Sequence, residues 1–221
     1  MPTASTNQRS FWDAVAPTRE FSHPLDLERL QGRVPPPARI LDYGCGYGRI
    51  CAQLHAAGYA GVRGVDPSPR MIERARAGHP DLAFDLLTGP KLQWPDQSFD
   101  AVLLFSVLTC IREDERQHEV VAEIRRVLRP HGVVYVSDLL LQDDDRNRAR
   151  YEEARVRLDA DRYGVFELEP GVVFRHLDRV WIDDLFAAFD ARELVELSVT
   201  TMNGNPARGF QLFARKPGIA G

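Results

Sequence analysis

Short apolar stretches alternate with helix-like segments along the middle of the chain. Four segments have the length and apolar content of buried strands: residues 39–42, 61–66, 99–105 and 133–137. Three segments beside them have the pattern of helices: residues 49–57, 69–78 and 113–128. Ser68 is suited to cap the second helix, and Pro69 to occupy its first position. The alternation predicts an α/β fold with a mainly parallel sheet and helices on both faces.

Two further segments flank or interrupt this core. Three consecutive prolines at positions 35–37 fix an extended backbone, and they separate an N-terminal arm or lid, residues 1–37, from the core. The alternation stops at Asp138. Residues 138–180 contain an acidic run, a charged helical segment over 145–160 and an aromatic stretch, so we interpret them as an inserted substrate cap.

The end of the chain returns to the core pattern. Residues 181–189 are expected to form a helix, and residues 194–200 and 210–215 alternate in the manner of strands. Between these strands, residues 203–206 read Asn-Gly-Asn-Pro, which is strong turn chemistry. The pattern predicts an antiparallel hairpin at the sheet edge, within a single domain of 221 residues.

The composition and charge of the chain disfavour a membrane protein, a nucleic-acid-binding protein and a zinc or disulfide-rich protein. No apolar run approaches the roughly 20 residues needed to cross a bilayer, and the N-terminus is polar, so we expect a soluble cytoplasmic protein without a membrane partner. The net charge of −4 provides no basic footprint for nucleic acid. The three cysteines have no paired metal spacing, so neither zinc nor a disulfide framework is expected. An exposed edge hairpin would allow a homodimer.

A glycine turn follows the first predicted strand. Such a turn lets the backbone approach a ligand closely and presents free amide groups at a helix start. Here the spacing is Gly44-x-Gly46-x-Gly48, whereas the dinucleotide-binding fingerprint is G-x-G-x-x-G. Asp42 lies just upstream, where its carboxylate would repel a pyrophosphate but attract an ammonium group.

Residues 40–49 resemble the first motif of class I S-adenosylmethionine-dependent methyltransferases of the small-molecule type. The resemblance implies a Rossmann-like sandwich with a mainly parallel seven-stranded sheet and an antiparallel edge hairpin. It also implies that S-adenosylmethionine is the cofactor and S-adenosylhomocysteine the product. The residues that it assigns to the methionine part of the cofactor are Asp42, Gly44, Cys45, Gly46 and Gly48.

A carboxylate at the end of the second strand, Asp66, can accept hydrogen bonds from both hydroxyls of a ribose. Residues 64–71 resemble the second motif of the same family, which implies that Pro67, Ser68 and Met71 border the adenine. An acidic residue at a strand end is equally often a helix cap, so the assignment of Asp66 depends on the resemblance.

Residues 92–100 resemble the family's approach to the fourth strand. Relatives usually carry an acidic adenine contact before this stretch, whereas this chain has Leu87 and Thr88, or Asp85 in a shifted register. By the same resemblance, Phe105 and Ser106 line the methionine pocket. In the arm, Trp12 and Arg19 are candidates to close over the cofactor carboxylate, although a docking helix would explain Trp12 as well.

The methyl acceptor depends on the cap and the arm. Candidate general bases are His176, ranked first, together with His23 and Glu167, because histidine titrates near neutrality. Candidate substrate contacts are Tyr163, Phe166 and Arg175, which can equally pack the cap against the sheet. The polar and aromatic cap favours O-methylation of a small polar molecule such as a sugar or a natural product.

Other functions remain open at this point. They are N- or C-methylation of a metabolite, methylation of RNA or protein, and a cofactor-binding regulator without turnover. The acidic run at residues 143–145 would suit magnesium, but the segment after the fourth strand lacks an acidic ligand. We therefore expect no metal.

Overall fold

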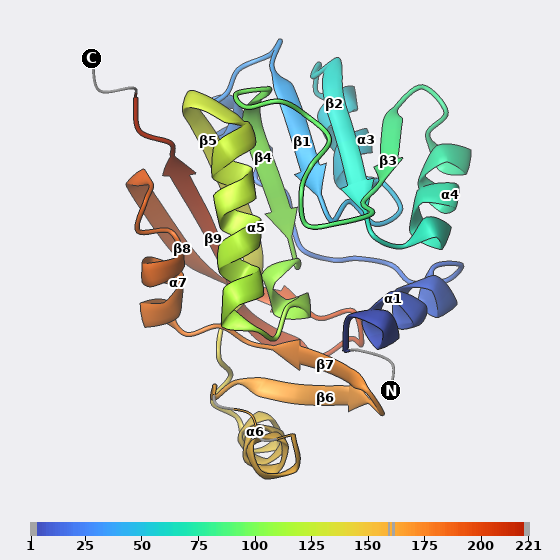
Figure 1. Ribbon diagram of the computed structural model, residues 1–221, viewed down its shortest axis with the longest axis vertical. Helices are drawn as coiled ribbons and strands as arrows, with labels where there is room; N and C mark the ends of the chain where they lie inside the picture. Colours follow the sequence, from blue (N-terminus) through green and yellow to red (C-terminus); the bar gives the residue numbers. More distant parts are fainter. Residues whose placement is uncertain (1–3, 159, 161, 219–221) are drawn as a thin grey trace.

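The computed structural model describes residues 4–158, 160 and 162–218. Its centre is a seven-stranded sheet in the order β3-β2-β1-β4-β5-β9-β8, in which β9 pairs antiparallel with both β5 and β8 and all other pairs are parallel (Figure 1). The predicted mainly parallel sheet with an edge hairpin is confirmed. The strands are β1 (Arg39–Tyr43), β2 (Gly61–Asp66), β3 (Ala83–Leu86), β4 (Phe99–Phe105), β5 (Leu128–Leu139), β8 (Asp190–Thr200) and β9 (Pro206–Arg215).

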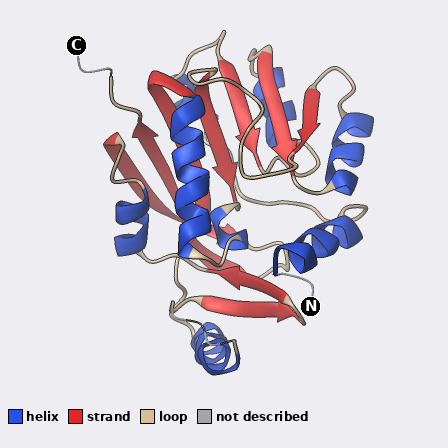
Figure 2. Ribbon diagram, in the orientation of Figure 1, coloured by secondary structure: helices blue, strands red, loops and turns tan. Residues whose placement is uncertain are grey.

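Helices cover both faces of the sheet, as predicted (Figure 2). Successive residues of a strand point to opposite faces, so Leu41 packs with α5 (Asp114–Val127) and α7 (Arg179–Leu185), whereas Ile40 packs with helices of the other face. Those helices are α2 (Leu27–Gln31), α3 (Arg49–Ala56) and α4 (Pro69–Gly78). None of the described helices is long and apolar enough to cross a membrane.

Local signals placed some helix ends correctly and others not. The Ser68 hydroxyl accepts the Met71 amide at 3.1 Å and Pro69 begins α4, as predicted. The helix expected over residues 181–189 instead begins at Arg179, because Asp178 caps it by accepting the Trp181 amide at 2.7 Å. The helix expected over residues 145–160 is α6 (Asp145–Arg157), which is shorter.

Three short strands, β3, β6 and β7, were not predicted from the sequence. Strand β3 has four residues and is half-buried, so its apolar pattern is weak. Strands β6 (Val165–Glu169) and β7 (Val172–Arg175) form a separate antiparallel pair, turned at Gly171 with a φ of +81°. The division of the chain into arm, core and substrate cap stays a prediction.

The β6–β7 pair lies beyond the carboxyl ends of β1 and β4, near α1 (Ala4–Val15) and the short helix η1 (Leu108–Cys110) (Figure 1). In α/β sheets, ligands bind at this edge. Phe11 and Trp12 of α1 pack edge-to-face on Phe174 of β7, with ring centroids 6.3 and 6.1 Å apart. The arm and the β6–β7 pair therefore meet above the sheet edge.

Candidate active site

The glycine turn between β1 and α3 brings backbone to the sheet edge. Gly44, Gly46 and Gly48 have φ angles of +76°, +54° and +83°, a region that side chains rarely adopt. The turn is held by the Gly44 and Cys45 amides, which donate to the Val65 carbonyl at 2.8 and 2.9 Å. A Cβ on Gly44 would lie 2.6 Å from Val107 Cγ2. The turn thus needs glycine both for its conformation and for its packing.

Asp66 ends β2 directly beside this turn. One carboxylate oxygen accepts the Gly46 amide and the other accepts the Ser68 amide, both at 2.9 Å. Burial raises the pKa of Asp66 to about 6, against the effect of these two amides. Each carboxylate oxygen has two lone pairs, so both can still accept a ligand hydroxyl. Asp66 therefore fits the predicted ribose contact while also tying the glycine turn to the start of α4.

Asp42 is almost completely buried below the turn. Its Oδ2 accepts a hydrogen bond from the Cys51 thiol at 3.3 Å, whereas Oδ1 is buried and has no partner among the described residues. Burial raises the pKa of Asp42 to about 7. A buried acceptor without a partner is costly, and an ammonium group would supply the missing donor. The residues present therefore fit the amino-acid end of S-adenosylmethionine.

The pKa of Asp42 leads to a testable pH dependence. An ammonium ligand needs the ionised carboxylate, which in the free protein is lost as the pH falls through about 7. We expect S-adenosylhomocysteine affinity to be about tenfold weaker at pH 6 than at pH 7.5, measured by calorimetry. The Asp42→Asn variant should lose most of this slope and keep only the part due to Asp66. An equally steep slope in the variant would contradict the assignment.

A cavity of about 660 Å³ joins these groups to the β6–β7 pair. This volume is typical of small-ligand sites, which span about 300–1,000 Å³. The predicted cofactor residues that line it are Trp12, Asp42, Gly44, Cys45, Gly46, Asp66, Pro67, Met71, Leu87, Thr88, Phe105 and Ser106. Of the two adenine alternatives, Thr88 lines the cavity, whereas Asp85 forms an ion pair with Arg63 at 3.3 Å.

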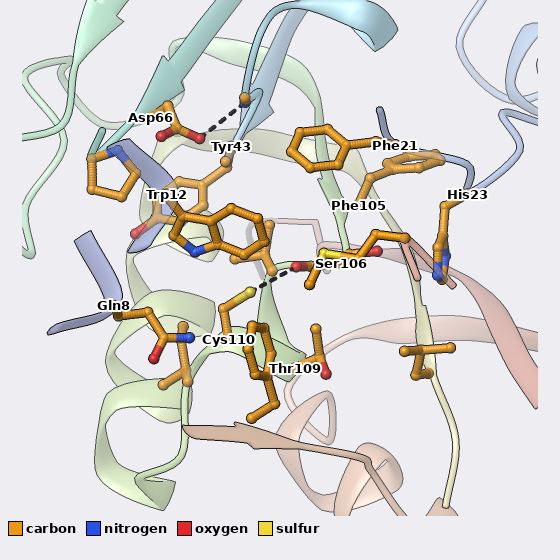
Figure 3. Close-up of a pocket in the computed structure, with 18 of the residues that line it drawn as sticks. Gln8, Trp12, Phe21, His23, Tyr43, Asp66, Phe105, Ser106, Thr109 and Cys110 are labelled. Carbon is orange, nitrogen blue, oxygen red and sulfur yellow. Dashed lines mark hydrogen bonds between the residues drawn. The ribbon is translucent and has the colours of Figure 1, made fainter. Parts of the chain in front are cut away.

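The arm forms one wall of the cavity. In Figure 3 the Trp12 indole lies in the middle of the view, between Asp66 and Cys110. Trp12 also packs edge-to-face on Phe21, which stacks on Tyr47 at 5.1 Å. Asp13 accepts hydrogen bonds from the Ser68 hydroxyl at 2.5 Å and the Arg70 amide at 3.2 Å, which fixes α1 to the start of α4.

The other end of the cavity is aromatic and carries one imidazole. Phe166 and Phe174 stack at 6.0 Å, and His176 lies 4.7 Å from Phe166 between ring centroids. Burial, together with the positive charges of Arg150 and Arg146, lowers the pKa of His176 to about 3. His176 is therefore neutral at neutral pH.

The hydrogen bonds of Tyr151 define which nitrogen of His176 is free. The Tyr151 hydroxyl accepts the Gln142 amide at 3.3 Å and contacts His176 Nδ1. Among the described residues, His176 Nδ1 is the acceptor that lies within reach of the Tyr151 hydroxyl proton. We therefore infer that the Tyr151 hydroxyl donates a hydrogen bond to Nδ1. The neutral ring then carries its own proton on Nε2. In this tautomer, Nε2 donates a hydrogen bond to a ligand and does not accept a proton.

His23 also lines the cavity, on the side of β5. Its Nδ1 lies 3.2 Å from the Ser137 hydroxyl. Burial, together with the positive charge of Arg49, lowers the pKa of His23 to about 4. Both candidate imidazoles are thus unprotonated at neutral pH, and both are weak bases.

The remaining predicted site residues do not line the cavity. Glu167 accepts hydrogen bonds from Arg157 and from the Gly171 amide, and Tyr163 is 43% exposed and packs edge-to-face on Tyr151. Arg175 is buried and pairs with Asp114 at 2.6 Å, whereas Arg19 donates to the Met202 carbonyl at 3.1 Å. Gly48 belongs to the glycine turn before α3, and Ser68 caps α4, so both lie beside the cavity without lining it. Geometry thus favours structural roles for these six residues.

Several cavity residues had no recognisable signal in the sequence. They come from the arm, from the start of α3, from η1 and from α6: Gln8, Phe21, Arg49, Cys110, Arg146 and Arg150. Arg49 was detectable in principle, since it directly follows the glycine turn. Among the described residues, no three His, Cys, Asp or Glu side chains are placed to hold a metal ion.

Comparison with known proteins defines the class. Residues 41–136 match the family model described as a methyltransferase domain. The crystal structure of an S-adenosylmethionine-dependent methyltransferase from Methanosarcina mazei has a TM-score of 0.78, 22% identity, and coverage of 88% of this chain and 99% of that chain. At this identity the likeness shows the fold, which is that of a Rossmann-like methyltransferase.

Two curated relatives extend the match beyond the domain model. The 27-O-demethylrifamycin SV methyltransferase of Amycolatopsis mediterranei is 32% identical over 171 residues, which cover 74% of this chain and 58% of that protein. The demethylmenaquinone methyltransferase of Chlorobaculum parvum is 30% identical over 149 residues, which cover 60% of each protein. The chain belongs to the class I S-adenosylmethionine-dependent methyltransferase family. It spans only 58% and 60% of the length of these two relatives.

Proposed function

We propose that this protein transfers a methyl group from S-adenosylmethionine to a hydroxyl of a small polar molecule, such as a sugar or a natural product. The observation that carries the proposal is the single cavity in which Asp42, Asp66 and the glycine turn share one space with Phe166 and His176. A cofactor at one end and an acceptor at the other would lie within reach of each other. Alignment of the two reactants contributes heavily to an in-line displacement.

The chain's own residues have separable tasks in this mechanism. When bound, S-adenosylmethionine supplies an electrophilic methyl group on a sulfonium. Asp42 binds the ammonium group, Asp66 binds the ribose, and Trp12 shields the cavity from water. The acceptor lies against Phe166, and His176 Nε2 donates a hydrogen bond that orients its oxygen. His23 remains the candidate proton acceptor on the opposite wall.

Two observations favour a small acceptor. The arm and the β6–β7 pair meet at the cavity by the sheet edge, through the contacts of Phe11 and Trp12 with Phe174, and this arrangement favours a small acceptor over a polymer. The relative from Amycolatopsis mediterranei is named for an O-demethylated natural product, which supports the same chemistry. The relative from Chlorobaculum parvum is named for another acceptor, so N- and C-methylation are outcomes that the test must separate.

The proposal is tested in two stages. Calorimetric titration should show binding of both S-adenosylmethionine and S-adenosylhomocysteine. The protein is then incubated with 13C-methyl-labelled cofactor and a panel of sugars, hydroxylated natural products and amines, and NMR locates the transferred methyl. A methoxyl signal supports the proposal. Methyl on nitrogen or carbon contradicts the acceptor assignment, and absence of cofactor binding contradicts the whole proposal.

His176 provides a more specific prediction. If Nε2 only donates a hydrogen bond, His176→Ala should lower kcat/KM by about 3- to 10-fold, the effect of one hydrogen bond. General-base catalysis is worth about 10²–10⁴-fold, so a loss in that range would instead establish His176 as the base. The Tyr151→Phe variant is the companion measurement, because it removes the donor to Nδ1 and leaves the ring in place.

A further inference from the structure

More cationic than acidic side chains line the cavity. Six arginines line the cavity: Arg9, Arg49, Arg112, Arg116, Arg146 and Arg150. Apart from Asp42 and Asp66 at the cofactor end, Glu113 is the acidic residue in the lining. The lining as a whole therefore carries an excess of positive charge, which an anionic ligand would balance.

Two of these arginines belong to the same helix, α6. Arg146 and Arg150 are four residues apart on α6, so they lie on the same face of the helix. Neither forms an ion pair with a carboxylate of the described residues. On the same helix, Arg148 lies 4.0 Å from Asp145 and Arg155 lies 3.9 Å from Glu152. The two unpaired cations of this helix are therefore the ones that line the cavity.

Arg150 is held in position before any ligand binds. Its guanidinium carbon lies 3.6 Å from the centre of the Phe166 ring. Its Nε is buried and has no hydrogen-bond partner among the described residues. Partial burial of this cation is costly and lowers the pKa of Arg150, while Tyr151 and Asp144 act in the opposite direction. An anionic ligand would remove this cost.

The lowered pKa of His176 also indicates that Arg146 and Arg150 lie near the acceptor end of the cavity. Arg150 and Arg146 both lower the pKa of His176, so their positive charges act on the wall where the acceptor would lie. Asp144 acts in the opposite direction on the same ring. Its carboxylate, however, is engaged at the start of α6, where it accepts the Asn147 amide at 3.1 Å.

We propose that the methyl acceptor carries an oxyanion, a carboxylate or a phosphate, which the guanidinium groups of Arg146 and Arg150 bind beside Phe166. A guanidinium matches both anions, because its fork of donors meets two oxygens at once. The inference rests on the proposed function, since it names the substrate class of that site. The acceptor is thus an acidic hydroxyl compound, and a neutral sugar is disfavoured.

The test uses the full chain saturated with S-adenosylhomocysteine. Benzoate, phenyl phosphate and the neutral benzyl alcohol are titrated separately, and binding is measured by calorimetry and by the NMR titration of His176. We expect one or both anions to bind at least tenfold more tightly than the alcohol and to raise the pKa of His176. Preference for benzoate or for phenyl phosphate identifies which oxyanion the acceptor carries.

Matched variants of α6 make the test specific. Arg150→Gln and Arg146→Gln should each weaken anion binding about tenfold or more and leave S-adenosylhomocysteine affinity unchanged. Arg148→Gln, on the same helix but outside the cavity lining, should change neither. Arg146 is exposed and does not pack on Phe166, so its variant remains informative if Arg150→Gln unfolds.

The outcomes separate the inference from the proposed function. If S-adenosylhomocysteine binds but the anions bind no better than benzyl alcohol, the anionic acceptor is wrong and the methyltransferase proposal stands. Anion binding that survives in both glutamine variants also overturns the inference. Failure of the wild-type protein to bind S-adenosylhomocysteine overturns the proposed function, and with it the anionic acceptor.

Discussion

Asp66→Ala should lower the affinity for S-adenosylmethionine by about 10²–10⁴-fold. The two carboxylate oxygens are expected to accept both ribose hydroxyls, and each hydrogen bond to a charged group is worth about 1.5–3 kcal/mol. The same carboxylate accepts the Gly46 and Ser68 amides at 2.9 Å, so its removal also loosens the turn against which the cofactor lies. Calorimetric titration of the variant measures the loss directly.

Two further variants show whether the effect belongs to the site. Asp66→Asn retains one acceptor oxygen and should fall between the wild type and alanine. Asp85→Ala, on the neighbouring strand β3, removes a carboxylate that pairs with Arg63 outside the cavity, and it should bind the cofactor normally. Cofactor binding by Asp66→Ala at wild-type strength would refute the ribose assignment.

Gly44→Ala should destabilise the fold by about 2–4 kcal/mol. Part of this cost is the left-handed backbone at φ +76°, which penalises a residue with a Cβ by about 1–2 kcal/mol. The remainder is overpacking, because the new Cβ would lie 2.6 Å from Val107 Cγ2. For a chain of this size the melting temperature should fall by roughly 5–15 °C, measured by calorimetry or circular dichroism.

The control is another glycine-to-alanine change. Gly78 is the last residue of α4, and a Cβ placed there would meet nothing within 4 Å. Gly78→Ala should therefore leave the melting temperature unchanged or slightly raised, because alanine is the better helix former. Equal melting temperatures for Gly44→Ala and Gly78→Ala would show that the turn tolerates a side chain and that its glycines have another role.

The cofactor half and the acceptor half of the cavity differ in how they are built. The cofactor half consists mostly of strand ends and one turn, whose positions follow from the parallel sheet. The acceptor half is assembled from α1, η1, α6, β6 and β7, which are far apart in the sequence. This difference explains why more of the residues assigned to the cofactor than of those assigned to the acceptor line the cavity.

Adjacent residues of the β6–β7 pair illustrate the limit of sequence reasoning. Arg175 and His176 are neighbours and were both expected at the substrate, yet Arg175 pairs with Asp114 of α5 while His176 lines the cavity. Likewise, Phe166 lines the cavity whereas its neighbour Glu167 does not, and the Glu167 carboxylate instead accepts hydrogen bonds from Arg157 and the Gly171 amide. In a strand, one residue of register reverses the direction of a side chain, and residue types alone do not reveal that register.

The sequence by itself determined the alternating α/β core, the start of α4 at Ser68 and Pro69, and the glycine turn with Asp42 and Asp66. These features depend on local periodicity, capping and backbone conformation, which are encoded within a few neighbouring residues. Only the tertiary structure decided which side chains face the acceptor. The position of Arg150 on the Phe166 ring, and of Arg146 in the cavity lining, arises from the packing of α6 on a distant strand pair, and long-range packing leaves no local pattern in the chain.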